Sequence, residues 1–366
     1  MEIDAPNISN LEKEIVRNAL DLGFVSTFGP FVSEFEQGIA EFIDVKNVVS
    51  LQSGTAALHM ALKECGVGLN DEVIVPVMTF VATANPILYL GAKPVFVDVD
   101  LNTWNIDPKE IEKVVTNRTK AILPVHLYGN PCKMDEIMKI AHDNKIYVIE
   151  DATESLGATY KGRHMGTFGS FGCLSFNGNK MITTGGGGMI VGVDEKQINH
   201  VRTLVNQGRD SANDYYCSEI GYNYRMTNLE ASLGIAQMKR LGEFINLKKE
   251  FNEIYKKELK NVEEIVFQDE YEGAKSSYWL TCIKLSEDIN VSEIMNQLKE
   301  DNIPTRRLFP PLTKFPSYEK YKTTSFNNAF SVYNNGLCLP SSTCNSKEDV
   351  RLVCKKLLEA ISNLKN

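Results

Sequence analysis

Features that mark membrane, secreted and nucleic-acid-binding proteins are missing from this 366-residue sequence. No apolar run approaches the roughly 20 residues of a membrane span. The first residues, Met1-Glu-Ile-Asp-Ala-Pro6, contain neither a basic nor an apolar region, so we expect no secretory signal. The formal net charge is −8, and no basic stripe offsets it. We therefore expect neither a membrane nor a nucleic acid among the partners of this protein.

Paired cysteines are missing as well. Eight cysteines stand at positions 65, 132, 173, 217, 282, 338, 344 and 354, and none belongs to a Cys-x-x-Cys pair. Cys338 and Cys344 are the nearest neighbours, and no histidine follows close by. This spacing argues against a zinc site and against a disulfide scaffold. The sequence predicts a reduced, cytoplasmic enzyme that holds no metal.

Strand and helix patterns alternate over the first two thirds of the chain. Strands are predicted at 47–51, 72–76, 94–99, 121–125 and 146–150, and helices begin near Ser9, Phe31 and Ser53 and span about 81–90. The last two strands are continuously apolar, as expected for a sheet covered on both faces. The alternation therefore predicts an α/β domain with a mostly parallel sheet.

The pattern changes near residue 246. A charged helix at 248–260, a strand at 278–285 and amphipathic helices at 292–299 and 350–361 indicate a smaller α+β domain. At 43% apolar residues, the chain can bury two cores. We predict a large domain at 1–245 and a small domain at 246–366, and the N-terminal segment is a candidate to pack on the small domain.

One lysine, Lys180, stands between a polar turn and four successive glycines, in Cys173-Leu-Ser-Phe-Asn-Gly-Asn-Lys-Met-Ile-Thr-Thr-Gly-Gly-Gly-Gly188. Such a run of glycines suits a tight bend or a close approach of bulky groups. A plain reading is a glycine-rich surface loop beside an ordinary lysine. The alternative is a lysine whose amine forms a Schiff base with a carbonyl.

Asp151 supports the second reading. It follows the apolar stretch Ile146-Tyr-Val-Ile-Glu150, at the strand end where open α/β sheets place their ligands. A lone acid there is commonly a helix cap. With Lys180 it gains another meaning, because a carboxylate keeps a pyridine nitrogen protonated and makes the ring an electron sink. Lysine and aspartate together are the minimum set for pyridoxal 5′-phosphate (PLP).

A phosphate seat and a ring contact are also available. Ser53-Gly-Thr55 follows a strand and opens a helix, where backbone N–H groups and the helix dipole favour an anion. The same residues also fit a plain N-cap. Phe80 follows another strand end and could stack on a ring, although a phenylalanine there also suits a core.

Seven motifs then occur in a fixed order along nearly the whole chain. They are Gly23-Phe-Val-Ser-Thr-Phe-Gly29, Gln52-Ser-Gly-Thr-Ala-Ala-Leu58, Val125-His-Leu-Tyr-Gly129, Ile149-Glu-Asp-Ala-Thr-Glu-Ser155, Ser175-Phe-Asn-Gly-Asn-Lys180, Gly221-Tyr-Asn-Tyr-Arg-Met226 and Cys338-Leu-Pro-Ser-Ser342. In this order they resemble the DegT/DnrJ/StrS family of PLP-dependent nucleotide-sugar aminotransferases. The resemblance implies the PLP-dependent transferase fold of type I, which is aspartate aminotransferase-like and joins a large α/β domain to a smaller C-terminal α+β domain.

The resemblance also implies roles for single residues. Lys180 is the Schiff-base lysine and moves the proton, Asp151 pairs with the pyridine nitrogen, and Glu154 lies near the ring hydroxyl. The phosphate and ring contacts fall to Gly54, Thr55, Ser175 and Phe80. Asn223 matches an asparagine that reaches the phosphate of a neighbouring subunit, so a homodimer with shared active sites is expected.

The intact Lys180 favours amino transfer over dehydration, and the Asn-Gly-Asn-Lys version most resembles the PglE/LegC-like branch. That branch implies transfer from L-glutamate to the 4-keto carbon of a UDP- or GDP-linked 4-keto-6-deoxy-N-acetylglucosamine, in bacterial aminosugar and glycan biosynthesis. A perosamine-type or a 3-keto-sugar aminotransferase is the alternative within enzymes, and a non-catalytic regulator with the PLP fold is the alternative outside them. His126, at a strand end, suits a structural or positioning role better than that of a general base. The arginines Arg225, Arg306 and Arg307 are candidates to contact the substrate diphosphate or the glutamate carboxylate, and they equally suit surface or interface charges.

Overall fold

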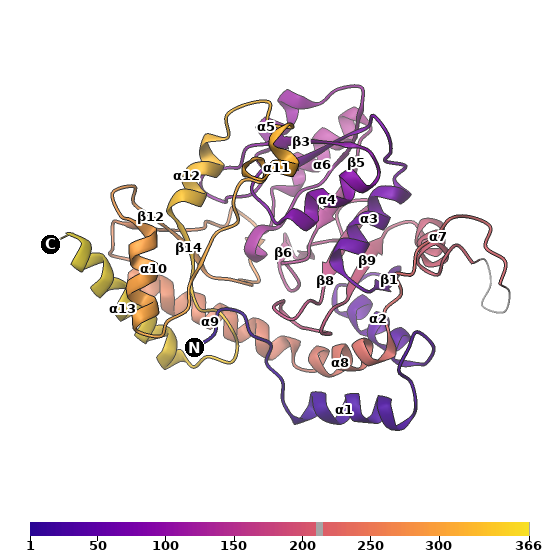
Figure 1. Cartoon of the computed structure of the whole chain (residues 1–366), viewed down its shortest axis with the longest axis horizontal. Coiled ribbons are helices and arrows are strands. Elements are labelled where there is room, and N and C mark those ends of the chain that lie inside the picture. Colours follow the sequence, from indigo (N-terminus) through magenta and orange to yellow (C-terminus); the bar gives the residue numbers. More distant parts are fainter. Residues whose placement is uncertain (210–214, 366) are drawn as a thin grey trace.

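A seven-stranded sheet organises the larger part of the molecule in the computed structural model, which describes residues 1–209 and 215–365 (Figure 1). Its strand order is β1-β9-β8-β5-β4-β2-β3. The strands are β1 (Val48–Leu51), β2 (Glu72–Pro76), β3 (Lys93–Val97), β4 (Thr119–Ile122), β5 (Tyr147–Asp151), β8 (Phe171–Ser175) and β9 (Gly188–Gly192). Across the sheet, the neighbouring strands β3, β2, β4, β5 and β8 pair in parallel. Strand β9 runs antiparallel to both of its neighbours, β8 and β1. The predicted mostly parallel sheet is confirmed.

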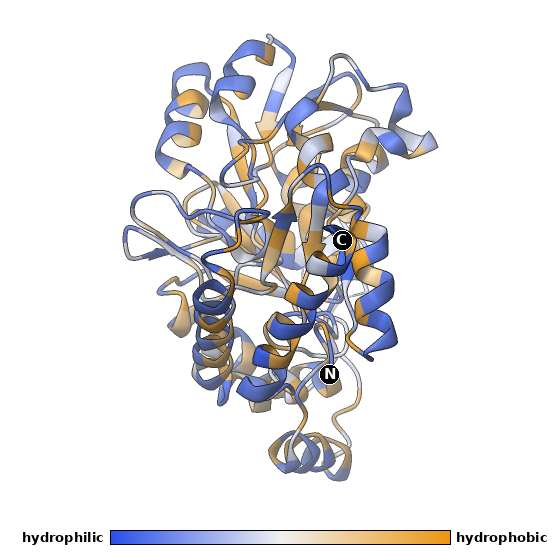
Figure 2. Cartoon of the chain, turned by 90° about the vertical axis from the view of Figure 1, so that its left-hand side faces the viewer, coloured by the Kyte–Doolittle hydropathy of each residue, from blue (hydrophilic) through white to orange (hydrophobic). Residues whose placement is uncertain are grey.

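Helices cover both faces of this sheet. One face carries α3 (Gly54–Glu64), α4 (Val81–Tyr89) and α7 (Glu195–Val205), and the other carries α2 (Phe31–Phe42), α5 (Pro108–Val114), α6 (Met134–Asn144) and α8 (Asn228–Met238). The alternation within β2 shows why its residues 73–75 are all apolar. Val73 and Val75 pack in the core beneath α3, whereas Ile74 packs in the core beneath α6. Figure 2 shows the apolar strands enclosed by helices of mixed polarity.

A second, antiparallel sheet has the strand order β10-β12-β14-β13. Its strands are β10 (Ile265–Phe267), β12 (Cys282–Leu285), β13 (Arg306–Arg307) and β14 (Gly336–Cys338), and it packs with α9 (Leu241–Leu259), α10 (Val291–Glu300) and α13 (Lys347–Lys365). Tyr255 of α9, Ile283 of β12 and Leu357 of α13 share this buried core. The predicted fold class is thereby confirmed, with a large α/β part and a smaller C-terminal α+β part. The boundary between residues 245 and 246 falls inside α9, and the division into 1–245 and 246–366 stays a prediction.

Other elements lie outside the two larger sheets and the helices packed on them. They are α1 (Asn10–Asp21), α11 (Pro316–Glu319), α12 (Asn327–Asn335) and a small sheet of β6 (Thr159–Tyr160), β7 (Arg163–His164) and β11 (Ala274–Lys275). The helix predicted to begin near Ser9 is present, and Ser9 and Glu12 exchange the hydrogen bonds of a capping box at its start. The strand predicted at 278–285 begins only at Cys282. Tyr278, where it was expected to start, adopts a left-handed backbone with φ of 49°, which a strand does not allow. In residues 1–209 and 215–365, no helix is long and apolar enough to cross a membrane.

The first seven residues run beside the segment that follows β14. The carbonyl of Ile3 accepts from the Ser341 amide at 2.8 Å, and the carbonyl of Ala5 accepts from the Ser342 hydroxyl at 2.8 Å. Glu2 exchanges two hydrogen bonds with the Asn345 side chain. The N-terminal segment is therefore held in place by its backbone.

A buried lysine lies where this segment meets α9. The amine of Lys248 donates to the carbonyl oxygens of Trp279 at 2.9 Å and of Ser341 at 2.8 Å. Burial lowers the pKa of Lys248 to about 8, partly offset by the charge of Asp4. A neutral amine still carries two N–H groups, enough for both carbonyls.

The lowered pKa of Lys248 predicts a stability that depends on pH. The unfolded chain binds this proton up to about pH 10.5 and the folded chain only to about pH 8, so folding releases it within that window. The free energy of unfolding should therefore increase from pH 8 to 10, relative to Lys248→Met, by about 1.4 kcal/mol per pH unit. Denaturant titration of both proteins measures this, with Lys249→Met as an exposed control. A constant difference across the window would contradict the prediction.

Candidate active site

Seven of the eight predicted cofactor residues line one cavity of about 330 Å³. The cavity lies where the ends of β5 and β8 and the starts of α3 and α4 face residues from the second half of the chain. The seven are Gly54, Thr55, Phe80, Asp151, Glu154, Ser175 and Lys180. The structure thus gathers residues that are up to about 125 positions apart, whereas the role of each remains a prediction.

Lys180 lies in the turn that follows β8. Its side chain is 13% exposed, and its amine lies 3.6 Å from Oε1 of Glu154 and 4.1 Å from the centre of the Trp279 ring. The indole N–H of Trp279 donates to the carbonyl of Asn179 at 2.6 Å. The amine is therefore confined between a carboxylate and an aromatic face, unlike an ordinary lysine on the surface.

Two of the glycines after Lys180 are explained by a close backbone contact. Gly187 donates to the carbonyl of Gln52 at 2.8 Å and has φ of +83°. A Cβ on Gly188 would lie 2.3 Å from the carbonyl carbon of Ser53. Only glycine lets β9 approach the turn that opens α3 this closely. Gly187 and Gly188 are buried, so the plain reading as a surface loop is wrong for this part of the run.

Asp151 is the last residue of β5 and is buried. Its Oδ2 accepts from the hydroxyl of Thr83 at 2.7 Å, and its Oδ1 accepts from the amide of Thr153 at 3.2 Å. Thr83 belongs to α4, so a helix from elsewhere in the chain orients the carboxylate. Sequence analysis missed Thr83, because no local signal distinguishes this threonine from an ordinary helix residue.

Glu154 has a different environment. Burial raises the pKa of this carboxyl group, and the charge of Lys180 opposes the rise. The amide of Tyr128 donates to Glu154 Oε2 at 2.8 Å. One oxygen of the group, Oε2, is thus fixed by the backbone, and the other, Oε1, is directed to the lysine amine.

The turn before α3 forms a candidate anion-binding site. Ser53 is the N-cap, and its hydroxyl accepts from the Ala56 amide at 3.1 Å. The amides at the start of a helix have no acceptor within the helix, and they favour an anion together with the helix dipole. A Cβ on Gly54 would lie 2.9 Å from the Cβ of Ser175, so glycine keeps room where the hydroxyl of Ser175 meets the helix start. A lysine, a buried carboxylate and this anion-binding site together fit PLP.

Aromatic residues form one wall of the cavity, and sequence analysis predicted Phe80 among them but missed Phe309 and Trp279. The rings of Phe80 and Phe309 have centroids 5.6 Å apart, and Phe309 stacks on Tyr128 at 5.3 Å. Phe80, Phe309 and Trp279 all line the cavity. Phe80 is 53% exposed, so its place is the rim and not the core.

Of the other candidate residues from the sequence, one arginine lines the cavity and the rest do not. Arg306 lines the cavity, whereas Arg307 donates to the carbonyls of Tyr333 and Asn334 at the end of α12. Arg225 donates to the carbonyl of Thr27 at 2.7 Å, away from the cavity. Asn223 is exposed and does not line the cavity of its own chain. Its predicted contact with a neighbouring subunit stays a prediction.

Comparison with known proteins identifies the family. A model of the DegT/DnrJ/EryC1/StrS aminotransferase family matches residues 6–358. The chain belongs to this family. It is 40% identical to EpsN of Bacillus subtilis (strain 168), provisionally named a pyridoxal phosphate-dependent aminotransferase, over 97% of this chain and 94% of EpsN. It is 39% identical to the GDP-perosamine synthase of Escherichia coli O157:H7, over 98% of both chains.

A solved structure extends the likeness to the fold of the aminotransferase. The PLP form of Spr1654 from Streptococcus pneumoniae, provisionally named a sugar aminotransferase, superposes with a TM-score of 0.94. The identity is 26%, and the match covers 100% of this chain and 99% of Spr1654. The chain is a PLP-dependent aminotransferase, as its motifs predicted. The narrower likeness to the PglE/LegC branch stays a prediction.

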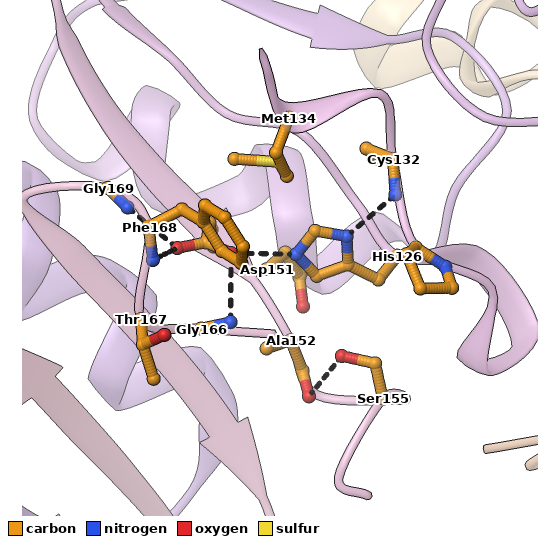
Figure 3. A network of polar contacts seen from close by, with 12 residues as sticks. His126, Cys132, Met134, Asp151, Ala152, Ser155, Gly166, Thr167, Phe168 and Gly169 are labelled. Atoms are coloured by element: carbon orange, nitrogen blue, oxygen red, sulfur yellow. Dashed lines mark hydrogen bonds and ion pairs between the residues drawn. The ribbon is translucent and has the colours of Figure 1, made fainter. Parts of the chain in front are cut away.

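A buried pair of polar side chains, His126 and Glu150, lies next to Asp151 in this aminotransferase. His126 Nε2 lies 3.0 Å from Glu150 Oε2, and both side chains are fully buried. The Nδ1 of His126 accepts from the amide of Cys132, which leaves the proton on Nε2 for Glu150. The amides of Gly166, Phe168 and Gly169 donate to the Glu150 carboxylate at 2.6–2.8 Å. Figure 3 shows these three residues grouped on the side of this network opposite His126. His126 is thus structural, and its backbone amide donates to the carbonyl of Asp151 at 3.1 Å.

Breaking this pair should destabilise the fold. In His126→Leu the Glu150 carboxylate keeps its three backbone amides and loses the hydrogen bond from His126 Nε2, and losing a hydrogen bond to a charged group costs about 1.5–3 kcal/mol. Chemical denaturation should detect the loss in the free energy of unfolding. His142→Leu, on the exposed end of α6, is the matched control and should change stability by less than about 0.5 kcal/mol. Equal stability of the two variants would contradict the structural role of His126.

Proposed function

We propose that this enzyme transfers an amino group from L-glutamate to the 4-keto carbon of a nucleotide-linked 4-keto-6-deoxy-hexose. The observation that carries the proposal is the single cavity in which Lys180 and Asp151 lie with Arg306 and an aromatic wall. Such a cavity offers a site for proton transfer, a cation for a carboxylate and flat faces for a sugar ring or a base.

The residues of this chain divide the work of amino transfer. When bound, PLP supplies an aldehyde that accepts amino groups and a ring that takes up electrons from the reacting carbon. Asp151, oriented by Thr83, holds the proton on the pyridine nitrogen. Gly54, Thr55 and Ser175 hold the phosphate, Phe80 covers the ring and Glu154 faces the ring hydroxyl.

Lys180 moves the proton. Its amine would take a proton from Cα of glutamate and deliver it to the cofactor carbon in the first stage, and would return a proton from that carbon to C4 of the sugar in the second. The Trp279 ring and Glu154 hold the amine close to the reacting carbons between these stages. Asn179, directly before the lysine, is fixed by the indole N–H of Trp279 and limits the path of the amine.

Arg306 binds the carboxylate of the amino donor. Lys180 and Arg306 are the cationic side chains among the described residues that line the cavity. A guanidinium pairs with a carboxylate through two parallel N–H groups. The sugar then lies along Phe309 and the rim at Phe80. We also propose a cytoplasmic homodimer in which Asn223 completes the phosphate site of the neighbouring subunit.

A GDP-perosamine-type reaction is a second candidate for the sugar. The 39% identity to a GDP-perosamine synthase over 98% of both chains favours it. The chemistry on this chain would be the same, and only the hexose and the nucleotide would differ. The first candidate remains a 4-keto-6-deoxy-N-acetylglucosamine linked to UDP or GDP.

Mass spectrometry of the products tests the proposal. PLP-loaded enzyme is incubated with ¹⁵N-glutamate and one nucleotide-linked 4-keto-6-deoxy sugar in each of three separate reactions. The three sugars are the UDP-linked N-acetylglucosamine form, the GDP-linked N-acetylglucosamine form and the GDP-linked precursor of perosamine. We expect one of the first two to gain a ¹⁵N amine. Conversion of the perosamine precursor alone would select the second candidate. Conversion of none, while 2-oxoglutarate still forms, would overturn both sugars and keep the transaminase.

A further inference from the structure

Asp4 lies 175 positions before Asn179 in the sequence, and its side chain reaches the rim of the active-site cavity. One of its carboxylate oxygens, Oδ2, lies 3.1 Å from Nη1 of Arg306 and 3.0 Å from Nδ2 of Asn179. The side chain of Asp4 is 16% exposed and that of Arg306 is 36% exposed. A single carboxylate therefore joins the cation of the cavity rim to the residue next to Lys180.

The position of Asp4 is imposed by its backbone. The neighbouring carbonyls of Ile3 and Ala5 are bound by Ser341 and Ser342, so the segment cannot slide past the cavity. Asn7 is fixed further along, where its side chain donates to the carbonyl of Thr343. Asp4 is thus held at a defined place, and its carboxylate is a fixed point for Arg306.

Arg306 faces the same indole ring as Lys180. Its Cζ lies 6.0 Å from the centre of the Trp279 ring, and the amine of Lys180 lies 4.1 Å from that centre. A guanidinium has five N–H donors, so the contact with Asp4 leaves others for a second carboxylate. Without Asp4 the long side chain would have to be ordered each time a ligand binds.

We propose that Asp4 is a positioning residue that holds Arg306 ready for the carboxylate of the amino donor and links this cation to the Lys180 turn through Asn179. The inference rests on the proposed function, because it assumes that Arg306 receives the donor. Ordering a flexible side chain before binding is worth about 3- to 10-fold in affinity. Asp4 thus acts on donor binding and not on the sugar.

The test measures binding and kinetics in PLP-loaded wild type, Asp4→Ala, Arg306→Ala and the double variant. Maleate, a dicarboxylate without an amino group, is titrated by calorimetry, so that donor-site binding is measured without turnover. The KM values for glutamate and for the nucleotide sugar are determined in parallel. Glu2→Ala is the matched control, because Glu2 is an exposed acid on the same fixed segment.

Asp4→Ala should weaken maleate binding and raise the KM for glutamate by about 3- to 10-fold, with less than about a 2-fold change in the KM for the sugar. The double variant should bind maleate no more weakly than Arg306→Ala, because Asp4 acts through that arginine. Unchanged or tighter binding in Asp4→Ala, or additive losses in the double variant, would overturn the inference. If wild type itself fails to bind maleate, the donor site proposed above is wrong and the inference falls with it.

Discussion

Replacing Lys180 with alanine should lower the rate of amino transfer by at least about 10⁴-fold. Under the proposed mechanism the variant loses both the amine that reacts with the cofactor and the base that moves the proton. The fold should persist, because the side chain makes its contacts within the cavity, with Glu154 and the Trp279 ring. Steady-state turnover with glutamate and the sugar substrate measures the effect, and circular dichroism confirms the fold.

Lys180→Arg is the matched control for charge. It keeps a cation that can face Glu154, yet a guanidinium stays protonated and neither reacts with an aldehyde nor accepts a proton. We therefore expect Lys180→Arg to be as inactive as Lys180→Ala. Turnover within about 10-fold of wild type in either variant would remove Lys180 from the mechanism.

Replacing Asp151 with asparagine should lower the rates of both half-reactions by about 10²- to 10³-fold. Asparagine keeps the size of the side chain and can still accept from Thr83, but it has no charge to hold the proton on the pyridine nitrogen. Because the same ring serves glutamate and the sugar, both stages should slow by similar factors. Single-turnover absorbance of the bound cofactor follows each stage separately.

Thr83→Val separates the effect of orienting the Asp151 carboxylate from the effect of its charge. It removes one hydrogen bond to Asp151 and leaves the carboxylate in place, so we expect a loss of less than about 10-fold. A change confined to one half-reaction in Asp151→Asn would contradict the assigned role. So would equal losses in Thr83→Val and Asp151→Asn, since orientation alone would then account for the effect.

The parts that sequence reasoning predicted share a local cause. Continuous apolar strands and capping residues are encoded within a few positions, so the sheet and the start of α3 could be placed. Lys180 and Asp151 stood out because a lysine before a glycine run and an acid at a strand end are unusual in combination. The structure also gives a reason for the glycines, since Gly188 has no room for a Cβ beside Ser53.

The parts that were missed depend on contacts between distant segments. Thr83, Trp279 and Phe309 carry no local mark, and each enters the cavity from a segment whose position only the complete fold determines. Asp4 is the clearest case, as it lies 175 positions from Asn179 along the chain. The start of β12 was predicted too early for a different reason, because the left-handed backbone at Tyr278 follows from no residue preference.

The most direct test of this account is to find the lysine that carries the cofactor. PLP-loaded enzyme is reduced with borohydride, digested and examined by peptide mass spectrometry. We predict a pyridoxyl phosphate adduct on the peptide that contains Lys180 and none in Lys180→Arg. An adduct on the buried Lys248 or on another lysine, with Lys180 unmodified, would contradict the assignment of the active site.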